Sequence, residues 1–159
     1  FTTLKDAGLK VLALDVVSLE TMQSDLGRLA EAINLRIEPQ SLFELAPLSL
    51  RAFVPIWRRP WMSIGAHTFG SQLLHAIGVA NIFEHSPSEY PEVDLAAVRD
   101  LSPDLVIVPS EPYEFDDDHL AELNDIAPCV RVDGRDLFWW GVRTPTAMQR
   151  LHDELRSTI

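Results

Sequence analysis

Short apolar runs alternate along the chain with longer stretches in which apolar residues recur every three or four positions. The short runs are rich in β-branched residues and predict buried parallel strands at 11–16, 52–56, 81–83, 105–108 and 129–132. The longer stretches between them predict amphipathic helices. Strands that alternate with helices indicate an α/β fold, in which a mostly parallel, Rossmann-like sheet is flanked by helices on both faces.

Polar residues and glycine mark the ends of these helices. N-terminal caps are predicted at Ser18, Thr68, Asp94 and the run Asp116–Asp118, and a last helix at Thr144 with Pro145 as N1. The helix after Ser18 carries an apolar stripe made of Leu19, Met22, Leu26, Leu29 and Ile33. Residues 35–50 contain two prolines and no sustained period, which predicts a partly helical connection.

Composition excludes several classes of protein. The 159 residues include 13 Lys and Arg against 24 Asp and Glu, a net charge of −11, so no basic face for nucleic acid or an anionic membrane is expected. The apolar runs are too short for a transmembrane helix. The single cysteine, Cys129, excludes an internal disulfide and a cysteine-based zinc cluster.

Aromatic residues gather in the loops that follow predicted strands. In a parallel sheet, ligands bind beyond the carboxyl ends of the strands, which here lead into loops 57–67, 109–117 and 133–143. These loops contain all four tryptophans together with Tyr113 and Phe115. Two interpretations stay open: the aromatic side chains cover the sheet end or a domain interface, or they form a ligand platform.

Three segments resemble a known family. VPIWRRPWMSIGAHTFGSQLLHAIGVANIF (54–83), YPEVDLAAVRDLSPDLVIVPSEPYEF (90–115) and DGRDLFWWGVRTPTAM (133–148) resemble three successive blocks in the second lobe of helical-backbone substrate-binding proteins. Proteins of this type bind vitamin B12 or ferric siderophores and serve ABC importers. The blocks follow in the family's order and at its spacing.

The resemblance implies a division of the chain. Residues 1–17 resemble the last piece of the N-terminal lobe, 18–50 the inter-lobe backbone helix and its connection, and 51–159 the C-terminal α/β lobe. Most of the first lobe is then missing, and with half a cleft we expect weak affinity for ligand. No signal peptide is visible at the start, and we expect a fragment of a longer chain.

The resemblance also implies the ligand-facing residues, which are Trp57, Pro60, Trp61, Glu111, Tyr113, Trp139, Trp140 and Arg143. Aromatic faces suit a large flat or amphipathic ligand such as cobalamin, haem or a ferric siderophore, and Arg143 can meet a carboxylate or phosphate. No cofactor or metal site is expected. The family contacts its permease through surface acids, for which Glu84, Glu89 and Glu92 are candidates.

Several other residues have ordinary structural interpretations. Asp116–Asp118 and His119 are expected to serve a helix start rather than a metal, since acids favour the positive end of the helix dipole. His67 and His75 are expected at a surface or interface, and Cys129 as an inert core thiol. For Arg58–Arg59, an anion clamp and a salt-bridged interface are both open.

The sequence therefore favours ligand capture without chemistry, by an extracytoplasmic component of an ABC importer. The alternatives are a cytosolic binding or regulatory module with the same fold, and an enzyme acting on a tetrapyrrole through Glu111, Tyr113 or His67. An exposed cleft face rich in aromatic residues would also allow a homodimer to form through it.

Overall fold

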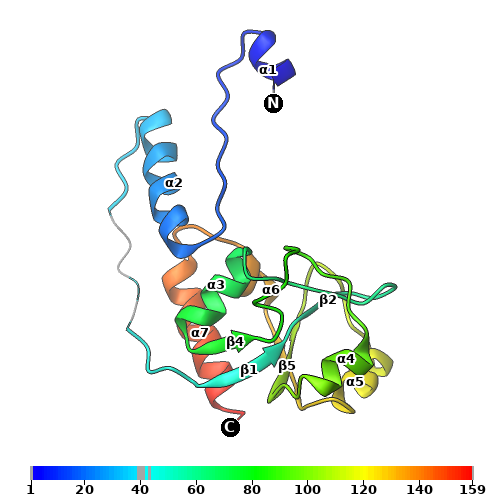
Figure 1. Cartoon of the computed structure of the whole chain (residues 1–159). Coiled ribbons are helices and arrows are strands. Elements are labelled where there is room, and N and C mark those ends of the chain that lie inside the picture. The colour runs from blue at the N-terminus through cyan, green and yellow to red at the C-terminus, as the bar shows by residue number, and fades with distance from the viewer. Residues whose placement is uncertain (1, 39–41, 43, 159) are drawn as a thin grey trace.

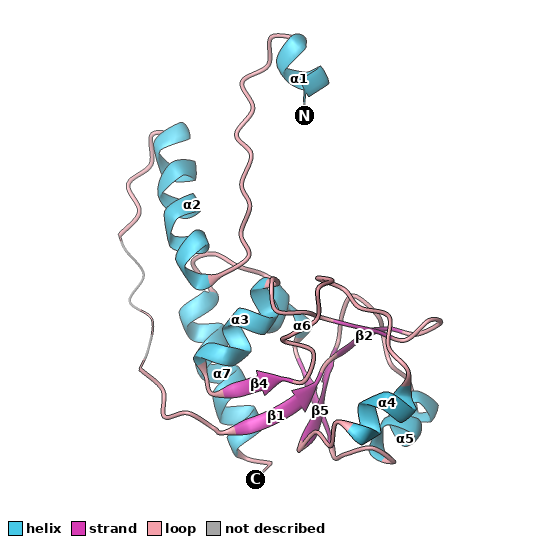
Figure 2. Cartoon of the chain, viewed as in Figure 1, coloured by secondary structure: helices cyan, strands magenta, loops and turns pink. Residues whose placement is uncertain are grey.

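The computed structural model describes residues 2–38, 42 and 44–158. Its centre is a four-stranded, all-parallel sheet with the strand order β4-β1-β5-β6 (Figures 1 and 2). The strands are β1 (Leu50–Phe53), β4 (Val79–Asn81), β5 (Leu105–Pro109) and β6 (Cys129–Val132). An antiparallel pair, β2 (Pro55–Trp57) and β3 (Met62–Ser63), follows β1. The predicted α/β class with a helix-flanked parallel sheet is confirmed.

Helices cover both faces of the sheet because its strands are apolar on both faces. On one side Ile107 of β5 packs with α3 (Phe69–Ala76), α6 (Gly134–Phe138) and α7 (Thr144–Arg156). On the other side Val106 and Val108 pack with α4 (Leu95–Asp100) and α5 (Asp117–Asn124). All five residues of β5 are buried, as expected for a central strand of a parallel sheet.

Two helices, α1 (Thr2–Asp6) and α2 (Leu19–Ala32), precede the sheet and its flanking helices, residues 50–158, which are called the lobe below. Met22 and Leu26 of α2 are buried against the core of the lobe, and the Thr144 hydroxyl lies 3.1 Å from Met22 Sδ. The far end of α2 projects away from the lobe, and α1 lies beyond it (Figure 1). Ile33, predicted as part of the apolar stripe, is exposed.

Several sequence predictions of local structure are confirmed. Ser18, Thr68, Asp94 and Asp116 all cap helices through their side chains, and β6 has the predicted bounds. Gly78, which follows α3, has φ +80° and packs so closely that a Cβ there would lie 2.6 Å from Pro47 Cα. This position therefore requires glycine.

Other predictions of local structure were wrong. Residues 11–16 form no strand, because no described strand lies beside them to complete a hydrogen-bonded ladder. The run 52–56 is divided between β1 and β2, and the strand predicted at 81–83 lies at 79–81. The described residues of 35–50 contain no helix, and the prediction for 39–41 and 43 lies outside the described part. The last helix begins at Thr144 as predicted, but its N-cap position is Arg143, which makes no capping hydrogen bond through its side chain, so Pro145 is the second helical residue and not the first.

The described helices are all too short or too polar to cross a bilayer.

Candidate functional site

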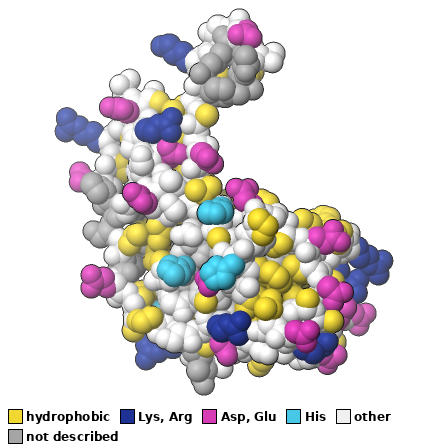
Figure 3. Space-filling view, viewed as in Figure 1, with side chains coloured by type: hydrophobic (Ala, Val, Ile, Leu, Met, Phe, Trp, Pro, Cys, Tyr) yellow, Lys and Arg dark blue, Asp and Glu magenta, His cyan; other side chains and the backbone are white. Residues whose placement is uncertain are grey.

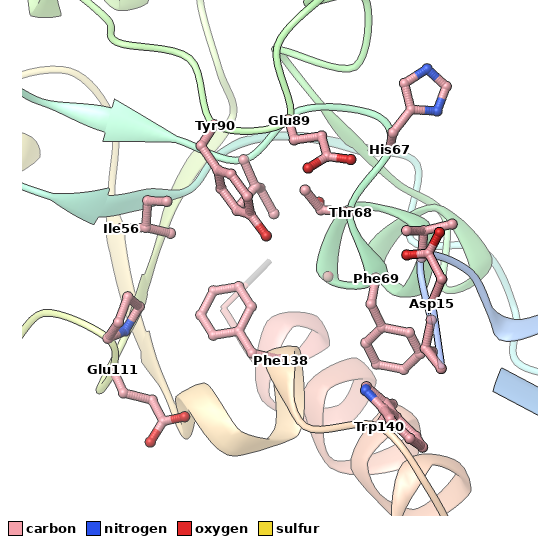
Figure 4. A pocket seen from close by; sticks show the side chains of 15 residues that line it. Asp15, Ile56, His67, Thr68, Phe69, Glu89, Tyr90, Glu111, Phe138 and Trp140 are labelled. Atoms are coloured by element: carbon pink, nitrogen blue, oxygen red, sulfur yellow. The ribbon is translucent and has the colours of Figure 1, made fainter. Parts of the chain in front are cut away.

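A cavity of about 440 Å³ lies at the carboxyl ends of the strands (Figure 4). Each of the four parallel strands leads into a connection that contributes to its wall, and the segment before α2 supplies one more side. Its lining consists of Asp15, Val16, Val17, Ile56, Ile64, His67, Thr68, Phe69, Gly70, Glu89, Tyr90, Glu111, Pro112, Phe138 and Trp140. The volume is in the range of small-molecule sites.

The strand order explains why a cavity forms at this place. The chain leaves β1 toward β4 on one side and leaves β5 toward β6 on the other. Neighbouring strands whose connections diverge leave a crevice beyond their carboxyl ends, where ligands bind in open α/β sheets. Ile56 after β1 and Glu111 after β5 line the cavity at this switch point.

One wall is the loop that follows β4, and buried polar contacts hold it in place. Asn81 is almost fully buried; its amide donates to Ile64 O at 2.7 Å and its Oδ1 accepts from Phe83 N at 3.1 Å. Further along, Gly65 N donates to Glu89 O at 2.7 Å. A Cβ on Gly65 would lie 2.2 Å from Ser88 O, so only glycine allows this approach. These contacts place Glu89 and Tyr90 at the cavity.

The opposite wall joins the loop after β5 to α6. Gly134, the first residue of α6, donates its N–H to Ser110 Oγ at 3.0 Å. A Cβ at this position would lie 2.5 Å from Glu111 Cγ and 2.8 Å from Glu111 N. The Glu111 carboxylate accepts a 2.5 Å hydrogen bond from Trp139 Nε1, which ties the loop to the end of the helix.

The segment before α2 closes a third side. Asp15 N donates to Asp25 Oδ2 at 2.9 Å, and Val17 N donates to Thr21 Oγ1 at 3.1 Å. With the reciprocal capping box between Ser18 and Thr21, these bonds fix the direction in which the chain enters the helix. Asp15 and Val17 are thereby brought to the cavity edge although their neighbours upstream form no regular structure.

The arginines near the cavity are engaged by carboxylates. Asp136, which is buried, accepts from Arg143 at 2.5 Å and from Arg150 at 2.6 Å. The Arg143 guanidinium also donates to Arg135 O. Arg135 in turn makes a two-pronged pair with Asp133, and its hydrogen bonds hold the pKa of the Asp133 carboxyl below its usual range. These guanidinium groups are therefore committed to the lobe's own carboxylates.

The structure divides the predicted ligand residues into groups. Glu111 and Trp140 line the cavity, and Trp139 lies at its edge, half exposed and bonded to Glu111. Arg143 is held by Asp136. Ligand contact by any of these residues stays a prediction.

The remaining three aromatic candidates lie in a cluster of their own. Trp57 contacts Tyr113 with ring centroids 5.1 Å apart, and Trp61 stacks on Phe115 at 5.8 Å. His119 packs edge-on against this group, and it also completes the cap of α5 with Asp116. Pro60 is an exposed residue of the turn between β2 and β3. None of these residues lines the described cavity.

Sequence reasoning missed several residues of the cavity wall. Tyr90, Glu89, Phe138 and Asp15 line it, yet none stands out in a motif of chemistry-bearing residues. One signal was available for Tyr90: it lies after the predicted strand at 81–83, so its loop belonged with the other loops at the carboxyl ends. Asp15 had no such signal, because it lies outside the sheet.

The other candidate groups take structural roles. Asp116 caps α5 as predicted, and no cluster of three potential metal ligands occurs among the described residues. Arg58 forms a 2.8 Å ion pair with Glu122 and lies over the Trp61 ring at 5.3 Å. Burial raises the pKa of the Cys129 thiol to about 11, in keeping with an inert cysteine. His67 and His75 are exposed.

Among the comparisons with known proteins, only the comparison of three-dimensional structures finds proteins similar to this chain. No family model and no curated protein sequence matches the chain. Among solved structures, a possible iron-binding periplasmic solute-binding protein of Staphylococcus epidermidis matches with a TM-score of 0.72 at 16% identity, over 97% of this chain and 69% of that one. The periplasmic vitamin B12 binding protein of Vibrio cholerae matches with a TM-score of 0.68 at 16% identity, over 98% and 68%.

A third match is the periplasmic heme-binding protein of Roseiflexus, with a TM-score of 0.73 at 16% identity, over 98% of this chain and 70% of that one. This chain has the fold of a periplasmic ABC substrate-binding protein. The resemblance inferred from the three sequence blocks is thus confirmed at the level of the fold. These three solved proteins are named for three different ligands, so the fold does not choose among these ligands.

Proposed function

We propose that this chain captures a small ligand, a metal chelate or a corrinoid, for delivery to an ABC importer, and that it does so without chemical turnover. One observation carries the proposal. In a fold whose named examples bind vitamin B12, heme or iron, all four strand connections converge on one cavity at the sheet's switch point. We propose residues 51–159 as the C-terminal lobe, 18–50 as the inter-lobe helix and connection, and 1–17 as part of the N-terminal lobe.

The lining of the cavity supports this assignment. Tyr90 brings an aromatic ring from the loop after β4, and Phe138 and Trp140 bring rings from the end of α6 and the residues after it. Phe69 adds a ring from α3 (Figure 4). Aromatic rings bury a large area with little loss of side-chain freedom, which suits a flat or amphipathic ligand. Cobalamin, haem and a ferric siderophore are the ligands we propose to compare.

Delivery to an importer implies a permease partner and an extracytoplasmic location, and both belong to this proposal. Glu84 and Glu92 lie on the loop after β4 but do not line the cavity, which makes them the candidate docking acids. Glu89 lines the cavity and is assigned to the ligand instead.

Titration calorimetry of the chain against cyanocobalamin, haem and a ferric siderophore tests the proposal. We expect saturable binding of one of them, weakened about fivefold by Trp140→Ala, since a lost aromatic contact is worth about 1 kcal/mol. Trp57→Ala is the matched variant, because Trp57 belongs to the separate aromatic cluster. Weakening by Trp57→Ala alone would place the ligand away from the cavity.

The same samples distinguish the alternative functions. Recovery of the ligand chemically unchanged after prolonged incubation is expected of a binding protein. A modified ligand would instead favour an enzyme that acts through Glu111 or His67. Absence of binding by all three compounds would contradict the proposal and favour a regulatory module that uses the same fold.

A further inference from the structure

The charged groups that line the cavity are of one sign. Asp15, Glu89 and Glu111 are the acidic residues of the lining, and the described lining contains no lysine or arginine. The Glu111 carboxylate points away from the centre of the cavity, which leaves Asp15 and Glu89 as its main charges (Figure 4). His67 is exposed, and its ring points away from the centre of the cavity (Figure 4). Carboxylates without a cationic neighbour in the lining give the cavity a negative potential.

Arg135 and Arg143, which flank the cavity residues Phe138 and Trp140 in the sequence, do not offset the negative charge of the cavity. Arg143 is bound to Asp136 and to Arg135 O, and Arg135 is bound to Asp133. Each guanidinium is thus compensated by a carboxylate outside the cavity lining. A ligand carboxylate would have to displace one of these pairs, and it would leave the buried Asp136 with one partner fewer.

Two of the three carboxylates are not used by the fold. The Glu111 carboxylate accepts from Trp139 Nε1. For the carboxylates of Asp15 and Glu89, the structure gives no hydrogen bond or ion pair with any described residue; only their backbone groups are bonded. These two carboxylates are therefore available to a ligand without breaking a contact.

The aromatic side chains in the walls of the cavity also favour a positively charged ligand. Tyr90 directs its hydroxyl end into the cavity, and Phe138 and Trp140 face it from α6 and the residues after it (Figure 4). The faces of aromatic rings carry negative charge density and attract cations. Carboxylates and ring faces together form the usual environment for a positively charged group.

We propose that the cavity selects metal chelates of positive or zero net charge and rejects anionic ones. Among ferric siderophores the favoured ligand is then a trihydroxamate complex that bears a free ammonium group rather than a catecholate complex, and haem with its propionates is disfavoured. This inference rests on the proposed function and narrows its ligand. On the face of the molecule shown in Figure 3, apolar and charged side chains are mixed, so the selection is assigned to the residues that line the cavity.

Binding of three probes to the full chain tests the charge selection. The probes are ferrioxamine B, which carries one ammonium group, its neutral N-acetylated form, and the anionic ferric tris-catecholate complex. We expect affinity to fall in that order, and the preference to shrink at high salt because ions screen the charges. Glu89→Gln and Asp15→Asn, which keep side-chain size, should each weaken ferrioxamine B about twofold to fivefold.

Asp100→Asn is the matched control, because Asp100 is an exposed acid on α4 outside the cavity lining, and it should leave all three affinities unchanged. Circular dichroism confirms that each variant is folded. If the catecholate complex binds most tightly, or if neither cavity variant changes the order, charge selection is overturned while the binding function stands. If no probe, cobalamin or haem binds, the proposed function and this inference both fail.

Discussion

Trp139 Nε1 donates a hydrogen bond to Glu111 Oε1 at 2.5 Å, and this bond connects two segments that follow neighbouring strands. Glu111 follows β5, and Trp139 directly follows α6, which itself begins two residues after β6. Both residues were predicted from sequence as ligand contacts. The structure shows that they also determine one another's position at the edge of the cavity.

The energy of this contact can be measured by a double-mutant cycle with Trp139→Phe and Glu111→Met, of which the second removes the acceptor and keeps the length of the side chain. Trp139→Phe removes the donor and keeps an aromatic ring. We expect a coupling of about 0.5–1 kcal/mol in urea unfolding, since the acceptor is charged but the indole is half exposed. A coupling of zero would mean that the bond is not populated in solution.

The substitution Gly134→Ala should disturb the same wall of the cavity, at the point where the start of α6 contacts Glu111. The added Cβ would lie within 2.9 Å of Glu111 N, Cγ and O, and two of these atoms are backbone atoms that cannot rotate away. We expect a loss of about 1–3 kcal/mol in unfolding free energy from this overlap.

Gly27→Ala on α2 is the control for Gly134→Ala. A Cβ at Gly27 meets nothing within 4 Å, so alanine should stabilise the protein by about 0.5–1 kcal/mol through its higher helix propensity. Equal effects of the two substitutions in urea unfolding would show that the approach of Gly134 to Glu111 is looser than described.

Asp25 should contribute to the acid sensitivity of the fold. The Asp15 N–H and then the Arg28 guanidinium hold the pKa of the Asp25 carboxyl below its ordinary value. Because the folded-state pKa is depressed, this stabilisation is present above the unfolded-state pKa and is lost as pH falls through the folded-state value.

Urea unfolding between about pH 5 and pH 2.5 measures this effect. Asp25→Asn should flatten the decline of stability with acid, and the exposed Asp100→Asn should leave it as in the parent protein. An unchanged decline in Asp25→Asn would contradict the assignment. Because an asparagine still offers an oxygen to the Asp15 N–H, Asp25→Asn removes the charge and leaves an acceptor for the attachment of Asp15 to α2.

Cys129 should react slowly with thiol reagents in the folded protein. Burial raises its pKa to about 11, although nearby Arg131 acts in the opposite direction, so the nucleophilic thiolate is scarce at neutral pH. We expect Ellman's reagent to react at least about tenfold faster in urea than in buffer, because unfolding restores the pKa of a free thiol. Equal rates would mean that the thiol is already exposed.

Local signals in the sequence were sufficient to predict those features in which a residue acts only on its immediate neighbours in the chain. Thr68 and Asp116 were identified as caps because a cap needs only a polar side chain before a helical stripe. The strand at 129–132 was identified because its apolar run is bounded by polar residues on one side and Pro128 on the other. α6 was missed, since a five-residue helix is shorter than two turns and shows no period.

Long-range relationships account for the other failures. Residues 11–16 have the composition of a buried strand, but a strand requires a neighbour, and composition does not provide one. The tryptophans of loop 57–67 were expected beside Trp140. They lie instead in a separate cluster with Phe115, because the β2–β3 pair carries them away from the cavity. The sequence alone therefore did not show that Trp57 and Trp61 belong to one site and Trp140 to another.

The bonds that hold Asp15 to α2 have a mechanical consequence. The helix has 14 residues, a length on the order of 20 Å, and the residues that pack in the core, Leu19, Met22 and Leu26, lie in its first eight positions. Asp15 and Val17 are bonded to side chains of this same helix. A force on the free end of the helix therefore displaces one wall of the cavity as well, so the tilt of α2 and the shape of the cavity change together.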